Sequence, residues 1–417
     1  MPDLRPFRGL RYDLSAVSDL GAVLCPPYDV ISAAERARLA ESDQHNAVRL
    51  ELPVAEDADG AADGYVAAAS LIDAWQGEGV LKRDEKPMLY VYEQRYSLAG
   101  VERVARSFFC RLGLEEYGPG SGVRPHERTM SAPKEDRFRL ISATRVNLSP
   151  VLFLYDDNAG GASSVRLMDA LTKAPPVARG TGPDGVEQRL WTVDPDSVPE
   201  AREVLAIAGA RPLSIADGHH RYETALRHRA HPDAPPGANY VLALLYDAHS
   251  GGLALRPWHR VVAGPLDAAA VLSAAATVFA SEPVKDAQEL LAHMRVGDPA
   301  PPPGTLGIWT RGGGAVLVVD AARAQQLDVD VLSDTLPAMI GSTSEELSAN
   351  GRLTYTPDAV AAIAAVDEGR ADVAFLVRPT PVEAVLSVAQ AGGFMPAKST
   401  YFHPKAATGL VFNPLWD

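Results

Sequence analysis

The stretch that most constrains this chain is residues 213–226, which reads LSIADGHHRYETAL. The short apolar run at 213–216 predicts a buried strand. Asp217 and Gly218 predict a sharp turn, and the apolar residues beyond them recur at helical spacing. We therefore expect a strand, a tight turn and a helix, in that order.

The first turn of this helix predicts an anion-binding site, because it carries His219, His220 and Arg221. Free backbone N–H groups and the positive end of the helix dipole meet at a helix N-terminus. The guanidinium of Arg221 offers a planar fork for phosphate or carboxylate, and imidazoles can move protons near neutral pH. The alternative is ordinary turn and capping chemistry with one structural histidine. Four polar or ionisable groups in five residues favour function.

Composition limits the class of protein. A chain of 417 residues exceeds one ordinary core, so two or three domains are expected. Hydrophobic residues make up 47% and charged residues 22%, as in soluble globular proteins. The net charge of −14 argues against a general nucleic-acid-binding surface. With only Cys25 and Cys110, the chain has no disulfide framework and no cysteine zinc site.

The sequence also predicts the cellular location of the protein and the kinds of partner it has. Its first residues lack an apolar signal core, and the longest apolar stretch, 268–280, is shorter than the ~20 residues that span a bilayer. We expect a cytoplasmic protein without membrane or nucleic-acid partners, and a homodimer is left open.

The order of elements predicts an α+β fold with a mixed sheet, because helices interrupt the strands irregularly. Strands are expected at 45–50, 88–93, 102–114, 151–155, 188–193, 213–216, 240–246, 253–262, 305–309, 314–319 and 372–377. Helices are expected at 33–41, 64–75, 133–144, within 157–185, at 199–208, from 219, and at 267–280, 286–296, 328–340, 358–368 and 381–390. The strand at 253–262 is expected to pair beside the one at 240–246, and Ser32 is expected to cap its helix.

Shifts in composition divide the chain into four parts. They are an N-terminal α/β segment at 1–85, a core at 86–262 that carries the Asp217 turn, a C-terminal α+β domain at 263–394, and a final segment at 395–417 that packs back near the site. The run Pro301-Pro302-Pro303 predicts a stiff linker or loop.

A second polar cluster follows the Gly-rich loop at 117–122. Arg124, His126, Glu127 and Arg128 bring both signs of charge and an imidazole into what is expected to be mostly loop, where functional side chains tend to lie. A solvated loop held by its own ion pairs is the alternative, and this segment alone leaves both open.

The C-terminal segment forms a third cluster. Lys398 and Lys405 are separated by hydroxyls, Ser399 and Thr400, and by aromatic residues, a combination that suits phosphate. The segment is rich enough in apolar residues to be ordered. The alternative is a docking segment with solvated lysines. We favour Lys398 for a pocket role, and Lys405 stays a candidate.

Several well-known signatures are absent from the sequence: the phosphate-binding G-x-x-x-x-G-K-[ST] loop, G-x-G-x-x-G opening a helix, the protein-kinase set and G-x-S-x-G. His219 and His220 are adjacent, and adjacent helical residues point about 100° apart, so both rarely bind one metal. A zinc site would need partners from elsewhere, such as His126 and Glu127.

Four segments, in order and across nearly the whole chain, resemble the bacterial and archaeal family called domain of unknown function 1015. They are CPPYDV at 25–30, RPHERT at 124–129, ADGHHRYETA at 216–225 and MPAKSTYF at 395–402. One departure is Pro125, where the family pattern leads us to expect threonine.

The DGHHR segment is also similar to one in ParB-like domains, a group that includes nucleotide-binding partition proteins, sulfiredoxin, and kinases that phosphorylate free L-serine from ADP or ATP. Pyrophosphate-using serine kinases resemble the family as well. The resemblance implies a ParB/sulfiredoxin-like core and a phosphate-binding, catalytic turn from Asp217 to Arg221.

The leading hypothesis is a small-molecule phosphotransferase, most specifically a free L-serine kinase that makes O-phosphoserine from ATP, ADP or pyrophosphate. Lys398 and Arg124 would neutralise charge in the transition state. Glu127 or Asp217 would accept the hydroxyl proton, and Mg²⁺ would bridge phosphate oxygens to the other carboxylate. The candidate catalytic residues are Asp217, His219, His220 and Glu127, and the candidate phosphate- or substrate-binding residues are Gly218, Arg221, Arg124, His126, Lys398, Ser399, Thr400 and Lys405.

Two other classes stay open. One is a ParB-like regulatory module that binds a nucleotide without transferring phosphate. The other is a metal-dependent phosphoester hydrolase built on His126 and Glu127, which would need zinc or manganese.

Overall fold

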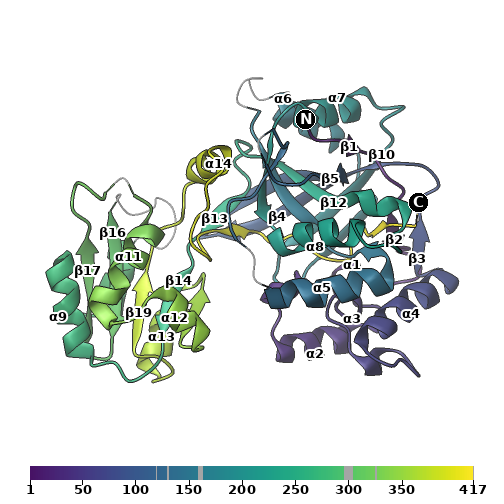
Figure 1. The fold of residues 1–417 in the computed structure, drawn as a ribbon. Coiled ribbons are helices and arrows are strands. Elements are labelled where there is room, and N and C mark those ends of the chain that lie inside the picture. The colour runs from purple at the N-terminus through teal and green to yellow at the C-terminus, as the bar shows by residue number, and fades with distance from the viewer. Residues whose placement is uncertain (119, 129–130, 158–162, 295–303, 325, 417) are drawn as a thin grey trace.

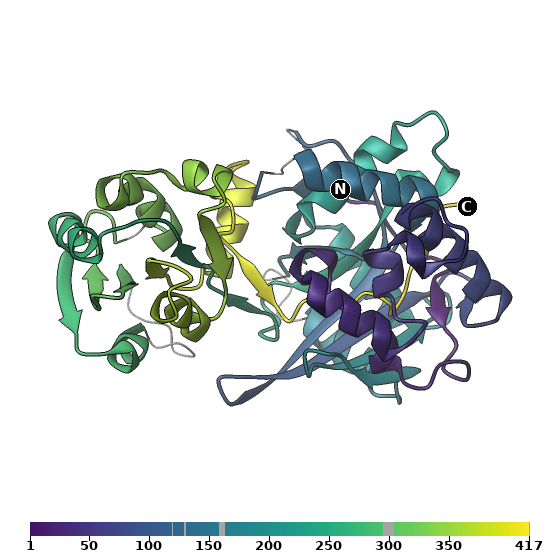
Figure 2. The ribbon, with the colours of Figure 1, turned by 90° about the horizontal axis from the view of Figure 1, so that it is seen from below.

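The computed structural model describes residues 1–417 apart from 119, 129–130, 158–162, 295–303, 325 and 417. The chain forms two lobes that lie side by side (Figures 1 and 2). The large lobe contains residues 1–253 and 379–417, and the small lobe contains 259–377. A two-stranded ribbon, β13 (Ala254–Arg256) paired with β20 (Tyr401–His403), joins them. Both ends of the chain lie on the large lobe.

The large lobe is built on a nine-stranded mixed sheet. Its order is β6-β11-β8-β12-β5-β4-β10-β9, with β1 also pairing with β5. The β6–β11 and β8–β12 pairs are parallel and the others antiparallel, which confirms the mixed-sheet α+β class. The strands are β1 (Leu4–Arg5), β4 (Leu89–Leu98), β5 (Val101–Gly113), β6 (Val123–Arg124), β8 (Val151–Tyr155), β9 (Ala178–Thr181), β10 (Glu187–Val193), β11 (Leu213–Asp217) and β12 (Tyr240–Asp247).

Both faces of this sheet are covered, which explains the continuous apolar run of β12. Leu242, Leu244 and Tyr246 face one core, and the residues between them face the other, as the twofold period of a strand requires. The first face packs against α1 (Leu20–Val23), α2 (Ala33–Ser42), α3 (Val48–Glu51), α4 (Gly64–Gly77), α5 (Ser131–Thr144) and α14 (Val382–Gln390). The second packs against α6 (Ser163–Leu171), α7 (Pro199–Gly209) and α8 (His219–Arg229).

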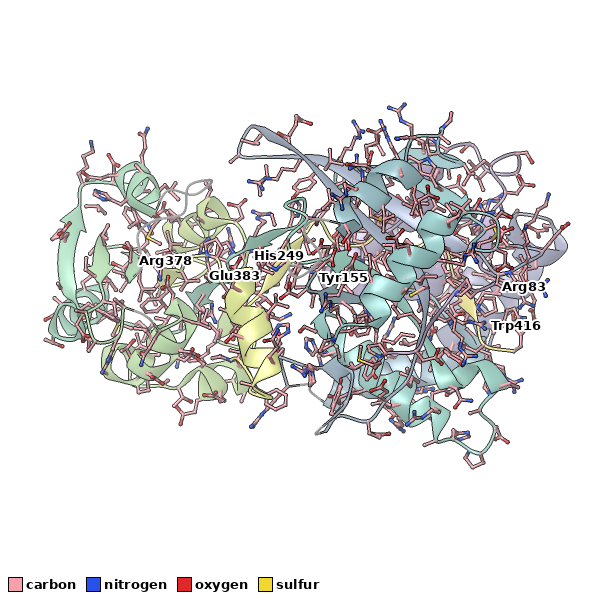
Figure 3. The ribbon with its side chains drawn as sticks, turned by 90° about the horizontal axis from the view of Figure 1, so that it is seen from above. Arg83, Tyr155, His249, Arg378, Glu383 and Trp416 are labelled. Atoms are coloured by element: carbon pink, nitrogen blue, oxygen red, sulfur yellow. The ribbon has the colours of Figure 1, made fainter. Side chains whose placement is uncertain are left out.

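Two small pairs complete the large lobe. They are β2 (Leu10–Tyr12) with β3 (Leu81–Arg83), and β7 (Val146–Asn147) with β21 (Asn413–Pro414). The second pair ties the last residues of the chain to the large lobe. In Figure 3, Arg83 and Trp416 accordingly lie at the end of this lobe far from the small one, whereas His249 and Glu383 lie near the junction.

The small lobe has an antiparallel sheet in the order β15-β17-β16-β19-β14-β18. Its strands are β14 (His259–Val262), β15 (Ala280–Val284), β16 (Thr305–Thr310), β17 (Gly313–Val318), β18 (Leu353–Thr356) and β19 (Val373–Leu376). One face packs against α9 (Ala268–Val278), α11 (Asp328–Ile340) and α12 (Ser344–Ala349), and the other against α10 (Ala287–Met294) and α13 (Ala359–Asp367).

Two of the expected elements are wrong. Residues 45–50 were expected as a strand, but the side chain of Asn46 accepts a hydrogen bond from the N–H of Val48 and starts the short helix α3. The stretch 253–262 does not pair beside β12, because β13 pairs with β20 and β14 with β18 and β19. Sequence neighbours were expected to be spatial neighbours, and here the chain leaves the large lobe instead.

Most other elements lie where they were expected. The β4–β5 hairpin turns at Ala99 and Gly100, and the Ser32 hydroxyl accepts the N–H of Glu35 at 3.2 Å. The sequence did not indicate α1 or α12, nor the strands β1, β2, β3, β6, β7, β9, β15, β18, β20 and β21. The expected linker at 301–303 and Thr129, the last residue of the RPHERT segment, lie outside the described residues. The four domain boundaries stay predictions. Within the described ranges, every helix is too short or too polar to cross a bilayer.

Candidate functional site

The site begins at the turn between β11 and α8, where the predicted strand, turn and helix are present. Gly218 has a φ of +91°, a region that favours glycine, and a Cβ there would lie 2.9 Å from Nε of Arg221. Gly218 is the N-cap of α8 and has no side chain to cap it. The first turn of α8 therefore starts without an N-cap side chain on its N–H groups.

Asp217 is the centre of a charge network at this turn. Its Oδ2 lies 3.1 Å from Nη2 of Arg221, and its Oδ1 lies 3.2 Å from Nζ of Lys405. Burial alone would raise the pKa of Asp217, but the charges of Lys405 and Arg221 outweigh it and hold that pKa well below its usual range. Asp217 is therefore a fixed anion, and the contact brings the C-terminal segment onto the central turn.

Arg221 is engaged within the protein. One Nη donates to the carbonyl of Pro150 and the other to Asp217, so its fork does not point freely into solvent. Its buried Nε has no partner among the described residues, nor has the buried Oε2 of Glu51. Both residues, with Arg137, line a cavity of about 50 Å³. Residue patterns did not single out Glu51 or Arg137, because no local signal distinguishes them.

Two neutral histidines join three segments of the site. Nδ1 of His126 lies 2.7 Å from the carbonyl of Ile215, so Nδ1 carries the proton, and Nε2 then accepts from the Thr400 hydroxyl at 3.1 Å. Nε2 of His219 accepts the backbone N–H of His126 at 3.3 Å. Burial lowers the pKa of His126 to about 4 and the pKa of His219 well below its usual value. Both act here as positioning residues.

The second and third clusters run side by side. Glu127 forms a parallel bridge with Met395, whose N–H donates to the carbonyl of His126 at 2.8 Å. The N–H of Lys398 donates to Oε1 of Glu127 at 3.4 Å. Burial raises the pKa of Glu127, the charge of Lys398 opposes this, and the charge of Asp217 adds to it. Glu127 is therefore a better proton acceptor near neutral pH than an exposed carboxylate.

The remaining candidates differ in position. Nζ of Lys398 lies 5.0 Å from the centre of the Trp258 ring. His220 is half-buried, which lowers its pKa, and the charge of Glu223 opposes that shift. The Ser399 hydroxyl donates to the carbonyl of Pro396 and shapes the turn.

Arg124 is not brought into the network. Its guanidinium donates at 3.5 Å to the carbonyl of Gln390 at the end of α14, and no described contact joins it to Asp217.

The first family-like segment also reaches the site. Cys25 and Thr408 form an antiparallel bridge, with N–H···O distances of 3.2 and 2.8 Å. Just beyond it, Tyr28 lies under the guanidinium of Arg137, 4.3 Å from ring centre to Cζ. Asp29 is exposed, and its charge acts on both Arg221 and Lys405. Neither Tyr28 nor Asp29 was among the residues expected at the site, although the rigid Pro26-Pro27 pair before them was a signal.

Metal ligands are sparse in the described part of the chain, which contains no group of three or more His, Cys, Asp or Glu side chains suited to an ion. Both oxygens of Asp217 are in ion pairs and do not fit Mg²⁺ in this arrangement. Glu127 fits better, because its described hydrogen bond engages only one of its oxygens.

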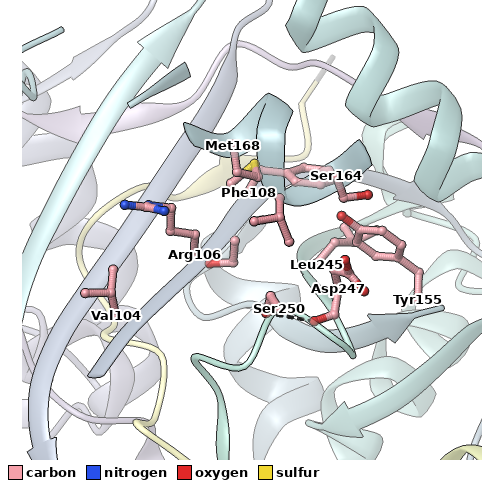
Figure 4. A pocket seen from close by; sticks show the side chains of 11 residues that line it. Val104, Arg106, Phe108, Tyr155, Ser164, Met168, Leu245, Asp247 and Ser250 are labelled. Carbon is pink, nitrogen blue, oxygen red and sulfur yellow. Dashed lines mark hydrogen bonds between the residues drawn. The ribbon is translucent and has the colours of Figure 1, made fainter. Parts of the chain in front are cut away.

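A separate pocket of about 40 Å³ lies between the large sheet and α6 (Figure 4). It is lined by Phe108, Tyr155 and Leu245, and by polar residues that are hydrogen bonded within the protein, apart from Ser107, whose buried hydroxyl has no partner among the described residues. The Ser250 hydroxyl, for example, donates to the carbonyl of Asp247 at 2.8 Å. This pocket is not part of the Asp217 network.

Comparison with known proteins gives a family and distant likenesses in structure. No curated protein matches the chain. A free serine kinase in complex with AMP has 13% identity and a TM-score of 0.37, over 67% of this chain and 83% of that one. A conserved hypothetical protein from Pyrococcus furiosus has 14% identity and a TM-score of 0.37, over 69% and 92%. SbnI from Staphylococcus aureus, truncated at its C-terminus, has 13% identity and a TM-score of 0.39, over 72% and 87%.

The match to a family model is far more extensive. The model described as Protein of unknown function (DUF1015) matches residues 4–332, which include the first three of the four family-like segments and most of the chain. The chain therefore belongs to the DUF1015 family.

Proposed function

We propose that this protein is a small-molecule phosphotransferase that uses L-serine as acceptor and ATP, ADP or pyrophosphate as donor. The observation that carries the proposal is the meeting of three distant segments at the start of α8. Asp217 is ion paired with Lys405, and Glu127, a carboxylate with a raised pKa, is hydrogen bonded to the backbone of Lys398.

The positive groups suit a phosphoryl group. Phosphoryl transfer asks mainly for positioning and for stabilisation of negative charge. The N–H groups at the start of α8 would bind the transferred phosphate, and Lys398 and Lys405 would neutralise its charge. Arg221 holds Asp217 and the Pro150 carbonyl in place, so we assign it to positioning the turn.

Glu127 would take the proton from the serine hydroxyl as the hydroxyl oxygen attacks the terminal phosphorus atom of the donor. The new O–P bond forms as the P–O bond to the rest of the donor breaks, so that ADP leaves from ATP, AMP from ADP, or inorganic phosphate from pyrophosphate. Its raised pKa brings it nearer to the pH at which a general base is effective. Mg²⁺ would supply charge neutralisation on the donor phosphates, and Asp217 does not fit it because both of its oxygens are in ion pairs.

The test is phosphorus NMR of the purified protein with Mg²⁺ and L-serine, offered ATP, ADP and pyrophosphate in turn. An O-phosphoserine resonance with one donor would support the proposal and identify the donor. Glu127→Gln should lower the rate by about a hundredfold, whereas Glu203→Gln, at an exposed position on α7, should leave it unchanged. Silence with every donor, together with nucleotide binding in calorimetry, would favour the regulatory module instead.

A further inference from the structure

We propose that Asp29 binds the α-ammonium group of the amino-acid acceptor, and so selects amino acids over other small alcohols. The inference rests on the proposed function and adds to it a specificity-determining residue, which lies in the family-like segment that the mechanism leaves unused.

The backbone brings Asp29 to the site. In the antiparallel bridge between Cys25 and Thr408, the residues that follow Cys25 run beside those that precede Thr408. Asp29 comes four residues after Cys25 and Lys405 three before Thr408, so they leave the bridge on the same side. Lys405 in turn is ion paired with Asp217 at 3.2 Å.

The segment that carries Asp29 is held firmly. Pro26 and Pro27 fix their own φ angles, and Tyr28–Val30 form a single 3-10 turn. The ring of Tyr28 lies against the guanidinium of Arg137, which also donates to the carbonyl of Glu51 at 2.8 Å. A carboxylate on such a support loses little conformational freedom when it binds a ligand.

The other carboxylates of the site already have partners. Asp217 has two cations, Glu127 accepts the N–H of Lys398, and Glu51 accepts the hydroxyl of Ser149 at 2.8 Å. Asp29 is exposed, and within the described ranges it makes no hydrogen bond or ion pair.

An amino acid needs both signs of charge from its site. Its carboxylate requires a cation, and its ammonium requires an anion that is not already neutralised. Lys398 and Lys405 carry positive charge into the site, and the charge of Asp29 also acts on His220 beside them. With the hydroxyl proton assigned to Glu127, the ammonium is the group still without a partner, and Asp29 has the charge to bind it.

The experiment compares two acceptors that differ only in this group: L-serine and 3-hydroxypropionate, which is serine without its amino group. In Asp29→Asn, kcat/KM for L-serine should fall about tenfold or more, mainly through KM, because a charge-assisted hydrogen bond is lost. The value for 3-hydroxypropionate should change less than about twofold. Asp59→Asn, at another exposed position, should change neither.

Other outcomes separate the inference from the proposed function. An equal fall for both acceptors, or no change for either, would overturn the role of Asp29 while leaving the kinase intact. If the parent protein phosphorylates no acceptor, the proposed function fails, and calorimetry with L-serine then tests Asp29 alone. L-serine binding that is lost in Asp29→Asn supports the inference, and binding that persists, or is absent from the parent, overturns it. A melting curve for each variant confirms that it is folded.

Discussion

Each lobe holds an arginine and a histidine in its interior, but the charges of these residues are compensated differently in the two lobes. In the large lobe, Arg221 is ion paired with Asp217 at 3.1 Å. In the small lobe, Arg260 is 3% exposed, and no ion pair joins it to another described residue. It donates to the carbonyl of Trp258 at 2.6 Å, and burial lowers its pKa to about 10. Burial of an arginine is thus not by itself the mark of a site.

The buried histidines of the two lobes, His126 and His259, differ in the same way. Nε2 of His126 accepts a hydroxyl and its Nδ1 donates to a carbonyl, so its ring joins two segments. His259 in β14 accepts the N–H of Val377 at 3.2 Å, but its buried Nε2 has no partner among the described residues. What distinguishes the site in the large lobe is that segments distant in sequence meet there and compensate one another's charge.

The largest loss of stability is expected when that compensation is removed. Asp217→Asn leaves Arg221 and Lys405 without their shared anion, and breaking a buried ion pair on one side typically costs about 3–5 kcal/mol. Urea unfolding should reveal this loss, with Asp59→Asn as the control. An unchanged urea midpoint would mean that the network contributes nothing to folding.

Acidification is expected to lower the free energy of unfolding by about 3 kcal/mol through the protonation of His126. His126 has a pKa of about 4 in the folded protein, against about 6.5 in an unfolded chain, so only the unfolded state gains its proton between these values. The contribution is present above pH 6.5 and is lost as the pH falls towards 4. The lowered pKa of Asp217 acts only below this window, and the raised pKa of Glu127 acts in the opposite sense.

The quantity to measure is therefore the difference between the parent and His126→Asn in unfolding free energy at pH 7 and pH 4.5. The parent should lose more stability than the variant on acidification. Equal losses in both proteins would show that His126 is not held neutral.

A small effect is expected in the small lobe. Arg260→Met should change the free energy of unfolding by less than about 1 kcal/mol, because replacing a buried charge by an apolar side chain of similar length removes its desolvation cost. The same substitution at Arg221 should cost about 3 kcal/mol, since it leaves Asp217 without one of its cations. Equal costs at the two positions would remove the contrast between the lobes.

The smallest effect on stability is expected at Lys398, which is partly exposed and lies over the ring of Trp258. The free energy of unfolding of Lys398→Met should lie within about 0.5 kcal/mol of that of the parent. The rate of phosphoryl transfer should nevertheless fall by about a hundredfold. Kinetics and melting on the same preparation give both numbers. A variant that keeps full activity would exclude Lys398 from the site.

Local patterns predicted much of the fold because the signals were local. Residues 213–229 carry an apolar run, a turn and a helical period in one stretch, and the structure has β11 and α8 there. At 45–50 the pattern was short enough to fit a strand or a helix, and the hydrogen bond from the N–H of Val48 to the side chain of Asn46 favours the helical turn. The pairing of β14 depends on β18 and β19, about 90 to 115 residues away, so the sequence around 253–262 contained no sign of it.

The site was predictable only in part for the same reason. Chemistry of residue types indicated Glu127, Asp217 and Lys398, but the ion pair between Asp217 and Lys405 spans nearly half of the chain. Glu51, Arg137 and Asp29 look like ordinary surface charges in sequence. Their relation to Arg221 comes from the packing of α3, α5 and the 3-10 turn against the central sheet.

The chain passes from the large lobe into the small lobe and then returns to the large lobe. This path also fixes the order in which the site is completed during translation. The ribosome makes the whole small lobe before it makes Lys398, Thr400 and Lys405. Until those residues emerge from the exit tunnel, Asp217 lacks one of its cations and His126 lacks its hydroxyl partner. A nascent chain therefore cannot complete this centre before its small lobe has been made, and a message cut short within the small lobe would yield a protein with the central turn but without its last contacts.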